Sequence, residues 1–116
     1  MNIDEEDIKI FEILNDSDEP LTANSTAKKM FETKDYYELK KKEQFVRNRI
    51  NKMISYNLLK TVYKDKKYYY TLNEENCVFG VGKIIHEAAK GTYTVNVGLA
   101  LLLKLNGKKI MYIEVK

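Results

Sequence analysis

The sequence predicts a small α+β protein with three helices and a hairpin in its first two-thirds, followed by a C-terminal extension of one more helix and a second β-hairpin. In the first half of the chain, large apolar residues recur every three or four positions, as in amphipathic helices. A basic, tyrosine-rich stretch with the pattern of a hairpin follows, and the chain from Thr92 onward alternates with a period of two, as in strands. With 116 residues, 44% of them hydrophobic, the chain has the size and composition of one globular domain with a small extension.

Two helices are expected before residue 32. The first begins after Asp4, whose carboxylate is suited to cap a helix N-terminus. Its apolar stripe consists of Ile8, Phe11 and Leu14. Residues 15–20, which hold the only proline, predict a turn. Thr22 or Asn24 then caps a second, shorter helix that ends near Phe31.

A third helix, from about residue 40 to residue 56, carries the most informative pattern. Its apolar side is formed by Val46, Ile50, Met53 and Ile54. Its opposite side is formed by Gln44, Arg47, Asn48, Asn51, Lys52 and Ser55. Amide and guanidinium groups bind base edges in a DNA major groove, and asparagine is a poor helix former. This face therefore favours a DNA-reading helix over the alternative, a merely solvated surface.

Residues 58–72 predict a hairpin with a basic tip. Two β-prone runs, 58–64 and 67–72, flank a short turn at Asp65 and Lys66, and Asn57 is expected to end the preceding helix in a left-handed conformation. The tip lysines are Lys64, Lys66 and Lys67. We expect Tyr68 and Tyr70 to pack the hairpin onto the core.

The charge distribution supports a surface that faces a polyanion. Residues 39–73 contain ten lysines and arginines but only two acidic residues, whereas residues 1–38 contain eleven acidic and four basic residues. A basic block of this density within a chain of net charge +3 is typical of contact with nucleic acid. The alternative is a solvated lysine-rich face.

Three segments together resemble the winged-helix branch of the helix-turn-helix proteins, in particular small archaeal, viral and bacterial regulators. They are PLTANSTAKKMF for the second helix, VRNRINKMISYNLL for the recognition helix and its exit, and KTVYKDKKYYYTLN for the wing. Asn57 stands where the family usually has glycine, and two aliphatic residues follow it, as in the family. The connector ETKDYYELKKK departs from the short turn that is usual there.

The resemblance implies a winged-helix DNA-binding domain over residues 1–73 and a role as a transcriptional regulator. The recognition helix would enter the major groove, and the wing, residues 58–72, would lie on the sugar-phosphate backbone. The residues expected to contact base edges are Gln44, Arg47, Asn48 and Asn51. Those expected to contact phosphates are Lys41, Lys42, Lys52, Lys64, Lys66 and Lys67. The rival interpretation is a winged-helix module that binds other proteins in a larger assembly without touching DNA.

Residues 74–116 form an extension that the family resemblance does not describe. We expect a helix over 74–91, capped by Asn73, with a strand through 77–82 as the alternative, because Gly80 and Gly82 each cost a helix about 1 kcal/mol.

A strand is expected from Thr92 onward, and its seven large apolar residues all have odd numbers from Tyr93 to Leu105, which predicts one buried face. Asn106-Gly107 is a preferred hairpin turn and residues 108–115 return. This pairs Leu103 with Ile110 and Leu101 with Tyr112. So much apolar surface predicts a homodimer through residues 74–116.

The sequence favours no enzyme, metal site or cofactor. Gly80-Val81-Gly82-Lys83 lacks the first glycine and the final Ser or Thr of a phosphate-binding loop. Cys77 and His86, nine residues apart, are too few for a zinc site and unsuited by spacing to one helix face. No apolar run is long enough to span a membrane, and MNIDEEDIKI lacks the features of a secretory signal, so a cytoplasmic location is expected. The composition suggests an archaeal or viral source.

Overall fold

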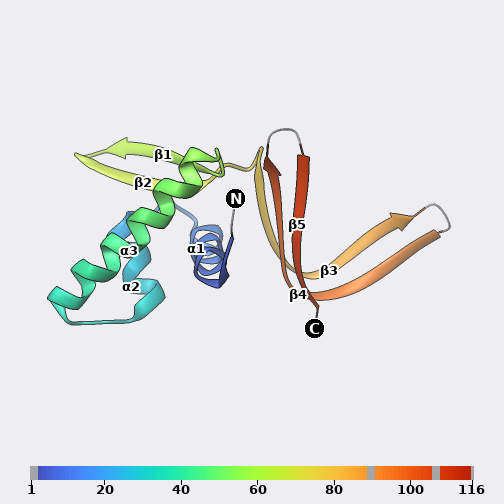
Figure 1. Ribbon diagram of the computed structural model, residues 1–116, viewed down its shortest axis with the longest axis horizontal. Coiled ribbons are helices and arrows are strands. Elements are labelled where there is room, and N and C mark those ends of the chain that lie inside the picture. The colour runs from blue at the N-terminus through green and yellow to red at the C-terminus, as the bar shows by residue number, and fades with distance from the viewer. Residues whose placement is uncertain (1–2, 89–90, 106–107, 116) are drawn as a thin grey trace.

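The computed structural model describes residues 3–88, 91–105 and 108–115, and it confirms the α+β class (Figure 1). The helices are α1 (Glu5–Asp16), α2 (Ala23–Phe31) and α3 (Tyr36–Ser55). The strands are β1 (Leu59–Lys64), β2 (Lys67–Leu72), β3 (Cys77–Ala88), β4 (Gly91–Leu105) and β5 (Lys108–Val115). β1 and β2 form a two-stranded antiparallel sheet, and the other strands form a second sheet in the order β3–β4–β5. In the described part of the chain, no helix is long and apolar enough to cross a membrane.

Side-chain caps fix where the helices begin. Asp4 caps α1 as predicted, and Asp7 returns the bond, so that each carboxylate accepts the other residue's backbone N–H, at 3.0 and 3.2 Å. Thr22 caps α2 by accepting the Ser25 N–H at 3.0 Å. α3 starts four residues before the predicted position because Asp35 accepts the Glu38 N–H at 2.9 Å.

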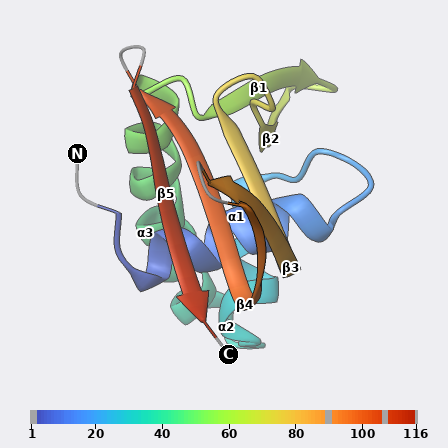
Figure 2. The ribbon, with the colours of Figure 1, turned by 90° about the vertical axis from the view of Figure 1, so that its right-hand side faces the viewer.

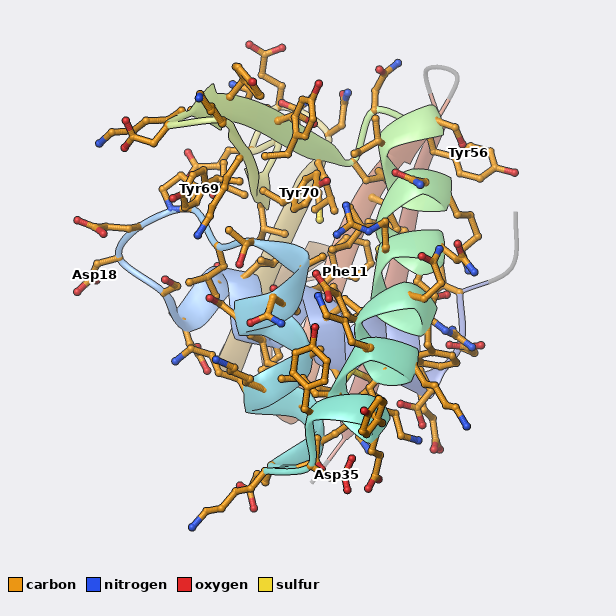
Figure 3. The ribbon with its side chains drawn as sticks, turned by 90° about the vertical axis from the view of Figure 1, so that its left-hand side faces the viewer. Phe11, Asp18, Asp35, Tyr56, Tyr69 and Tyr70 are labelled. Carbon is orange, nitrogen blue, oxygen red and sulfur yellow. The ribbon has the colours of Figure 1, made fainter. Side chains whose placement is uncertain are left out.

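The core lies where the three helices meet the β1–β2 hairpin. The predicted stripe of α3 is buried at Val46, Ile50 and Met53, and Ile54 packs against the core while partly exposed. From the other elements, Ile10, Phe11, Ala27 and Leu58 are also fully buried. Figure 3 shows Phe11 and Tyr70 in the interior, between the helices and the hairpin, with Asp35 and Tyr56 at opposite ends of α3.

The β1–β2 hairpin has the predicted turn. Asp65 and Lys66 have φ values of 51° and 65°, which is the pair of left-handed residues that a tight two-residue hairpin loop requires. Asn57 is also left-handed, with φ 60°, so the predicted end of α3 is confirmed. Backbone hydrogen bonds of 2.7 and 3.0 Å between Leu21 and Tyr70 fasten the hairpin to the segment before α2.

The prediction that two tyrosines pack onto the core is confirmed for one and wrong for the other. Tyr70 is buried, but Tyr68 is 54% exposed. Tyr68 lies next to the turn, where the hairpin extends past the core, and it packs instead against Tyr63 with ring centroids 4.9 Å apart.

The predicted helix over residues 74–91 is wrong, because β3 occupies Cys77–Ala88, and the alternative prediction of a strand through 77–82 agrees with β3. The valines, isoleucines and phenylalanine here favour a strand, and Gly80 and Gly82 disfavour a helix. In the sheet these two glycines flank a shift in the register between β3 and β4. The predicted pairs Leu103–Ile110 and Leu101–Tyr112 are both present between β4 and β5. The predicted Asn106-Gly107 turn lies outside the described residues.

The odd-numbered residues of β4 do not all share one face, contrary to prediction. Between Val97 and Leu99 the register with β5 shifts, so that Val97 pairs with Val115 but Leu99 pairs with Glu114. An extra residue in one strand reverses the alternation beyond it. The odd positions from 99 to 105 therefore lie on one face and those from 93 to 97 on the other. Figure 1 shows β3 and β4 bending away from the helices at this place.

The β3–β4–β5 sheet packs on the helical part through its first strand pair. Cys77 and Leu103 are register partners, and both belong to the buried core, with 1% and 0% of their surface exposed. Figure 2 shows the three strands side by side across the helices, with β4 in the middle. Because the outer parts of β3 and β4 extend beyond the helices, the molecule is elongated, with extents of 55 × 28 × 26 Å.

Candidate nucleic-acid interface

An open groove of about 590 Å³ lies between the start of α2, one side of α3 and the tip of the β1–β2 hairpin. We call it the basic groove. Its basic residues are Lys28, Lys40, Arg47, Lys66 and Lys67. Its other residues are Thr22, Ala23, Asn24, Ser25, Glu43, Tyr68 and Tyr69. Three elements that are distant in sequence thus bring five cations around one hollow.

Glu43 positions two of these cations. Its carboxylate accepts a hydrogen bond from Arg47 Nη2 at 3.1 Å and lies 3.5 Å from Lys40 Nζ. The Glu43 side chain is only 14% exposed, whereas those of Arg47 and Lys40 are 41% and 55% exposed. The carboxylate therefore holds the two cationic side chains along the groove while their outer surfaces remain open to solvent.

A row of amides continues the same side of α3. Gln44, Asn48 and Asn51 are exposed, and Gln44 Nε2 donates to Asn48 Oδ1 at 2.8 Å. An amide side chain offers both a donor and an acceptor. The four residues predicted to contact base edges, which are these three and Arg47, thus share one exposed side of α3, although only Arg47 lines the basic groove.

α1 contacts α3 on another side of the helix, which begins at Lys52, one turn after Asn48. Lys52 Nζ binds Asp7 Oδ2 at 2.6 Å, and Arg49 Nη1 binds both Asp4 and Asp7. The Asp7 side chain is completely buried, so these cations neutralise a carboxylate inside the protein. Lys52, which was predicted to contact phosphate, is therefore engaged in the α1–α3 contact and does not line the basic groove.

The other predicted phosphate contacts are divided between surfaces. Lys66 and Lys67 line the basic groove, and exposed Lys64 lines a separate hollow beside Pro20. Lys41 and Lys42 line a third hollow, of about 700 Å³, where Lys42 Nζ lies 4.7 Å from the centroid of the Phe31 ring.

The ion pairs with Arg49 and Lys52 hold the acidic start of α1 against α3. The Arg49 hydrogen bond and the Asp7 backbone N–H hold the pKa of Asp4 at about 2, below its usual 3.8. The same hydrogen bond raises the pKa of Arg49. Lys40 and Arg49 are nine positions apart, so they project from α3 in directions about 180° apart. The ion pairs of Glu43 and those of Arg49 therefore lie on opposite sides of α3.

Lys28 and Lys40 belong to the basic groove but were not among the predicted contacts. Lys40 stands seven residues before Arg47, two helical turns away on the same side of α3, and this spacing is the signal that would have identified it. Lys28 carries no such signal, since its position depends on how α2 packs against α3.

Comparison with protein-family models, curated proteins and solved structures gives no match to this chain. Within the residues that the structure describes, no group of three or more His, Cys, Asp or Glu side chains is placed to hold a metal ion. The assignment of a function therefore rests on the geometry and charge of the surface itself.

Proposed function

We propose that this protein binds double-stranded DNA with a preference for sequence, as a winged-helix transcriptional regulator. The observation that carries the proposal is the basic groove, in which cations from α2, α3 and the hairpin tip surround a hollow next to an exposed row of amides. Three helices followed by an antiparallel hairpin are compatible with the winged-helix arrangement.

In this proposal α3 supplies the sequence preference. Its 20 residues span about 30 Å, and an α-helix fits the DNA major groove. Arg47 is suited to bind guanine with two hydrogen bonds, and Asn48 or Asn51 to bind adenine in the same manner. Asn48 and Asn51 are exposed, Arg47 is partly exposed, and the buried stripe lies behind all three, so that the core holds them in position for the bases.

The hairpin tip and the start of α2 supply contacts with phosphate. Lys66 and Lys67 reach the basic groove from the turn, and Lys28 and Lys40 lie on the helices across from them. α2 has no acidic residue in its first turn, so the positive end of its dipole is not offset there. Such contacts position a protein on the duplex and make binding dependent on salt.

The test is fluorescence anisotropy with a labelled random duplex at two salt concentrations. We expect the wild-type chain to bind, with affinity falling steeply as salt increases. Lys40→Ala and Lys28→Ala should each weaken binding several-fold. Lys9→Ala, which removes the same charge from an exposed position on α1, should not.

Absence of binding at low salt, or equal losses for Lys9→Ala and the groove variants, would contradict the proposal. The first result would favour the alternative function, a module that binds protein rather than DNA.

A further inference from the structure

The outer edge of β5 has no neighbouring strand among the described residues, because β5 ends the sheet order β3–β4–β5. Figure 2 shows β5 along one side of the sheet. The strand has eight residues, KKIMYIEV, and the four in its middle are all apolar. A long apolar edge offers outward N–H and C=O groups as a template for another strand.

We propose that a second copy of this chain pairs its own β5 with this edge, antiparallel, so that the two sheets join into one of six strands. A dimer with two-fold symmetry uses the same surface on both copies, and an antiparallel pairing of one strand with itself meets that requirement. β5 is thus the strand that joins the two copies, and this pairing does not depend on DNA binding.

The charges of β5 select one register. A two-fold axis perpendicular to the sheet leaves the two faces of the sheet unexchanged. It therefore pairs even-numbered residues with even-numbered ones and odd-numbered residues with odd-numbered ones, because side chains alternate between the faces along a strand. When the axis passes through Met111, Lys108 of each copy lies opposite Glu114 of the other, and Ile110 lies opposite Tyr112. Opposite charges directly across an antiparallel pair stabilise it, and symmetry provides this pair twice.

The register centred on Tyr112 pairs as many residues as the one centred on Met111, but it places no opposite charges across from each other. With the axis through Tyr112, Lys109 lies opposite Val115 and Glu114 lies opposite Ile110, so neither charge has an opposite charge across from it. With the axis through Ile110, fewer residues overlap. The pairing centred on Met111 is therefore the one that uses both the length and the charges of the strand.

Pairing at the edge is also compatible with how the sheet packs on its own chain. Cys77 and Leu103 are buried, and Ile110 is next in the same register row, so that row lies on the face toward the core. The free N–H and C=O groups of β5 point sideways in the plane of the sheet, whereas the core lies against one of its faces, so a second strand can pair there without displacing the core. Because the axis is perpendicular to the sheet, both helical parts lie on the same side of the joined sheet.

Sedimentation equilibrium on the full chain, without DNA, tests the proposal through charge reversal. We expect the wild type to be a dimer and Lys108→Glu or Glu114→Lys to raise the dimer dissociation constant about tenfold or more, since each places like charges opposite each other twice. The double variant, Lys108→Glu with Glu114→Lys, should recover an affinity within about threefold of wild type. Lys109→Glu, the matched control, should remain a dimer because it lies opposite Ile113.

Circular dichroism separates dissociation from unfolding, and Met111→Lys, which brings two lysines together on the axis, should also dissociate while keeping its helical signal. A wild type that stays monomeric at high micromolar concentration overturns the dimer. A double variant that is not rescued, or a Lys109→Glu variant as weak as Lys108→Glu, overturns this pairing of β5 and points to a different surface or partner.

Discussion

Arg47 shows how a single side chain connects the fold with the proposed function. It lies one position after buried Val46, so the packing of the helix determines where its guanidinium lies. Its bond to Glu43 then orients the group along the basic groove. The side chain that is proposed to read a base is thus already positioned before DNA is present, which lowers the entropy lost on binding.

Removing the groups proposed to read bases should flatten the preference among DNA sequences without unfolding the protein. Each two-hydrogen-bond contact with a base contributes about 1–3 kcal/mol of discrimination, so Arg47→Ala and Asn48→Ala should each lose roughly that preference at one position. Neither residue is in the core. The measurement is competition among a panel of duplexes, with Asn15→Ala, an exposed asparagine of α1, as the control. If both variants rank the panel as the wild type does, α3 is not the reading element.

Asp4 should make stability depend on pH in the acid range. Its folded pKa is about 2 against an ordinary 3.8, so its stabilising effect is present above about pH 4 and is lost as the pH falls through 2. Because the side chain is 45% exposed, solvent screening limits the effect to about 1 kcal/mol. Urea unfolding between about pH 5 and pH 2 should show a shallower loss for Asp4→Asn than for wild type. A variant with the wild-type slope would contradict this role, and Asp16→Asn provides the control.

Local sequence rules predicted the conformation and capping role of several residues correctly. They failed for side chains whose partner is distant in sequence. The caps at Asp4 and Thr22 and the left-handed Asn57 follow from nearest neighbours and backbone geometry. The engagement of Lys52 with Asp7 joins positions 45 residues apart, and no periodicity within one helix reveals it.

At the scale of elements, α1 and α3 are held together by ion pairs. Buried Asp7 accepts from Lys52 and Arg49 and also completes the cap of α1. Because one carboxylate serves the helix start and the packing of two helices, its removal should disturb both.

Asp7→Asn should therefore lower the free energy of unfolding by about 3 kcal/mol, since it leaves two cations beside a buried neutral group. Chemical denaturation monitored by circular dichroism measures the change. Glu12→Gln, at an exposed position of the same helix, should change stability by less than about 0.5 kcal/mol. Equal stability of Asp7→Asn and wild type would show that the ion pairs contribute nothing.

The hairpin tip should contribute to salt dependence in proportion to its charges. Each phosphate contact adds about 0.9 to the slope of log affinity against log salt, so Lys66→Ala with Lys67→Ala should lower the slope by about 2. The loss should be similar for all duplexes. The control is Lys9→Ala with Lys60→Ala, which removes the same charge outside the basic groove. An unchanged slope in the hairpin variant would mean that the tip points away from DNA.

Prediction of elements succeeded where one pattern dominated. The three helices and both strands of the β1–β2 hairpin follow from apolar spacing and turn residues. The segment after Asn73 was ambiguous, because Val78, Val81 and Ile85 suit a helix face as well as a strand. Pairing with β4 makes this segment a strand, and that pairing joins residues distant in sequence, which the local pattern does not reveal. The register shift near Val97 was hidden for the same reason.

For the whole molecule, the division of charge around α3 is the central feature. Acidic α1 neutralises Arg49 and Lys52, the basic groove lies on the opposite side of α3 from Arg49, and the amides lie between the two. Although the net charge is only +3, the acidic and basic side chains are thus concentrated on different sides of the molecule. The sequence revealed the basic block, but the choice of which lysines face the groove depended on how three elements pack together.

Amide chemical shifts during titration of the isotopically labelled chain with duplex DNA test the proposed DNA-binding surface most directly. We expect the largest changes at the start of α2 (22–25), on the exposed side of α3 between 40 and 51, and at the hairpin tip (64–68). The surface formed by α1 and the outer part of the β3–β4–β5 sheet should change little. No changes at low salt, or changes confined to α1 and that sheet, would contradict the claim that the basic groove binds DNA.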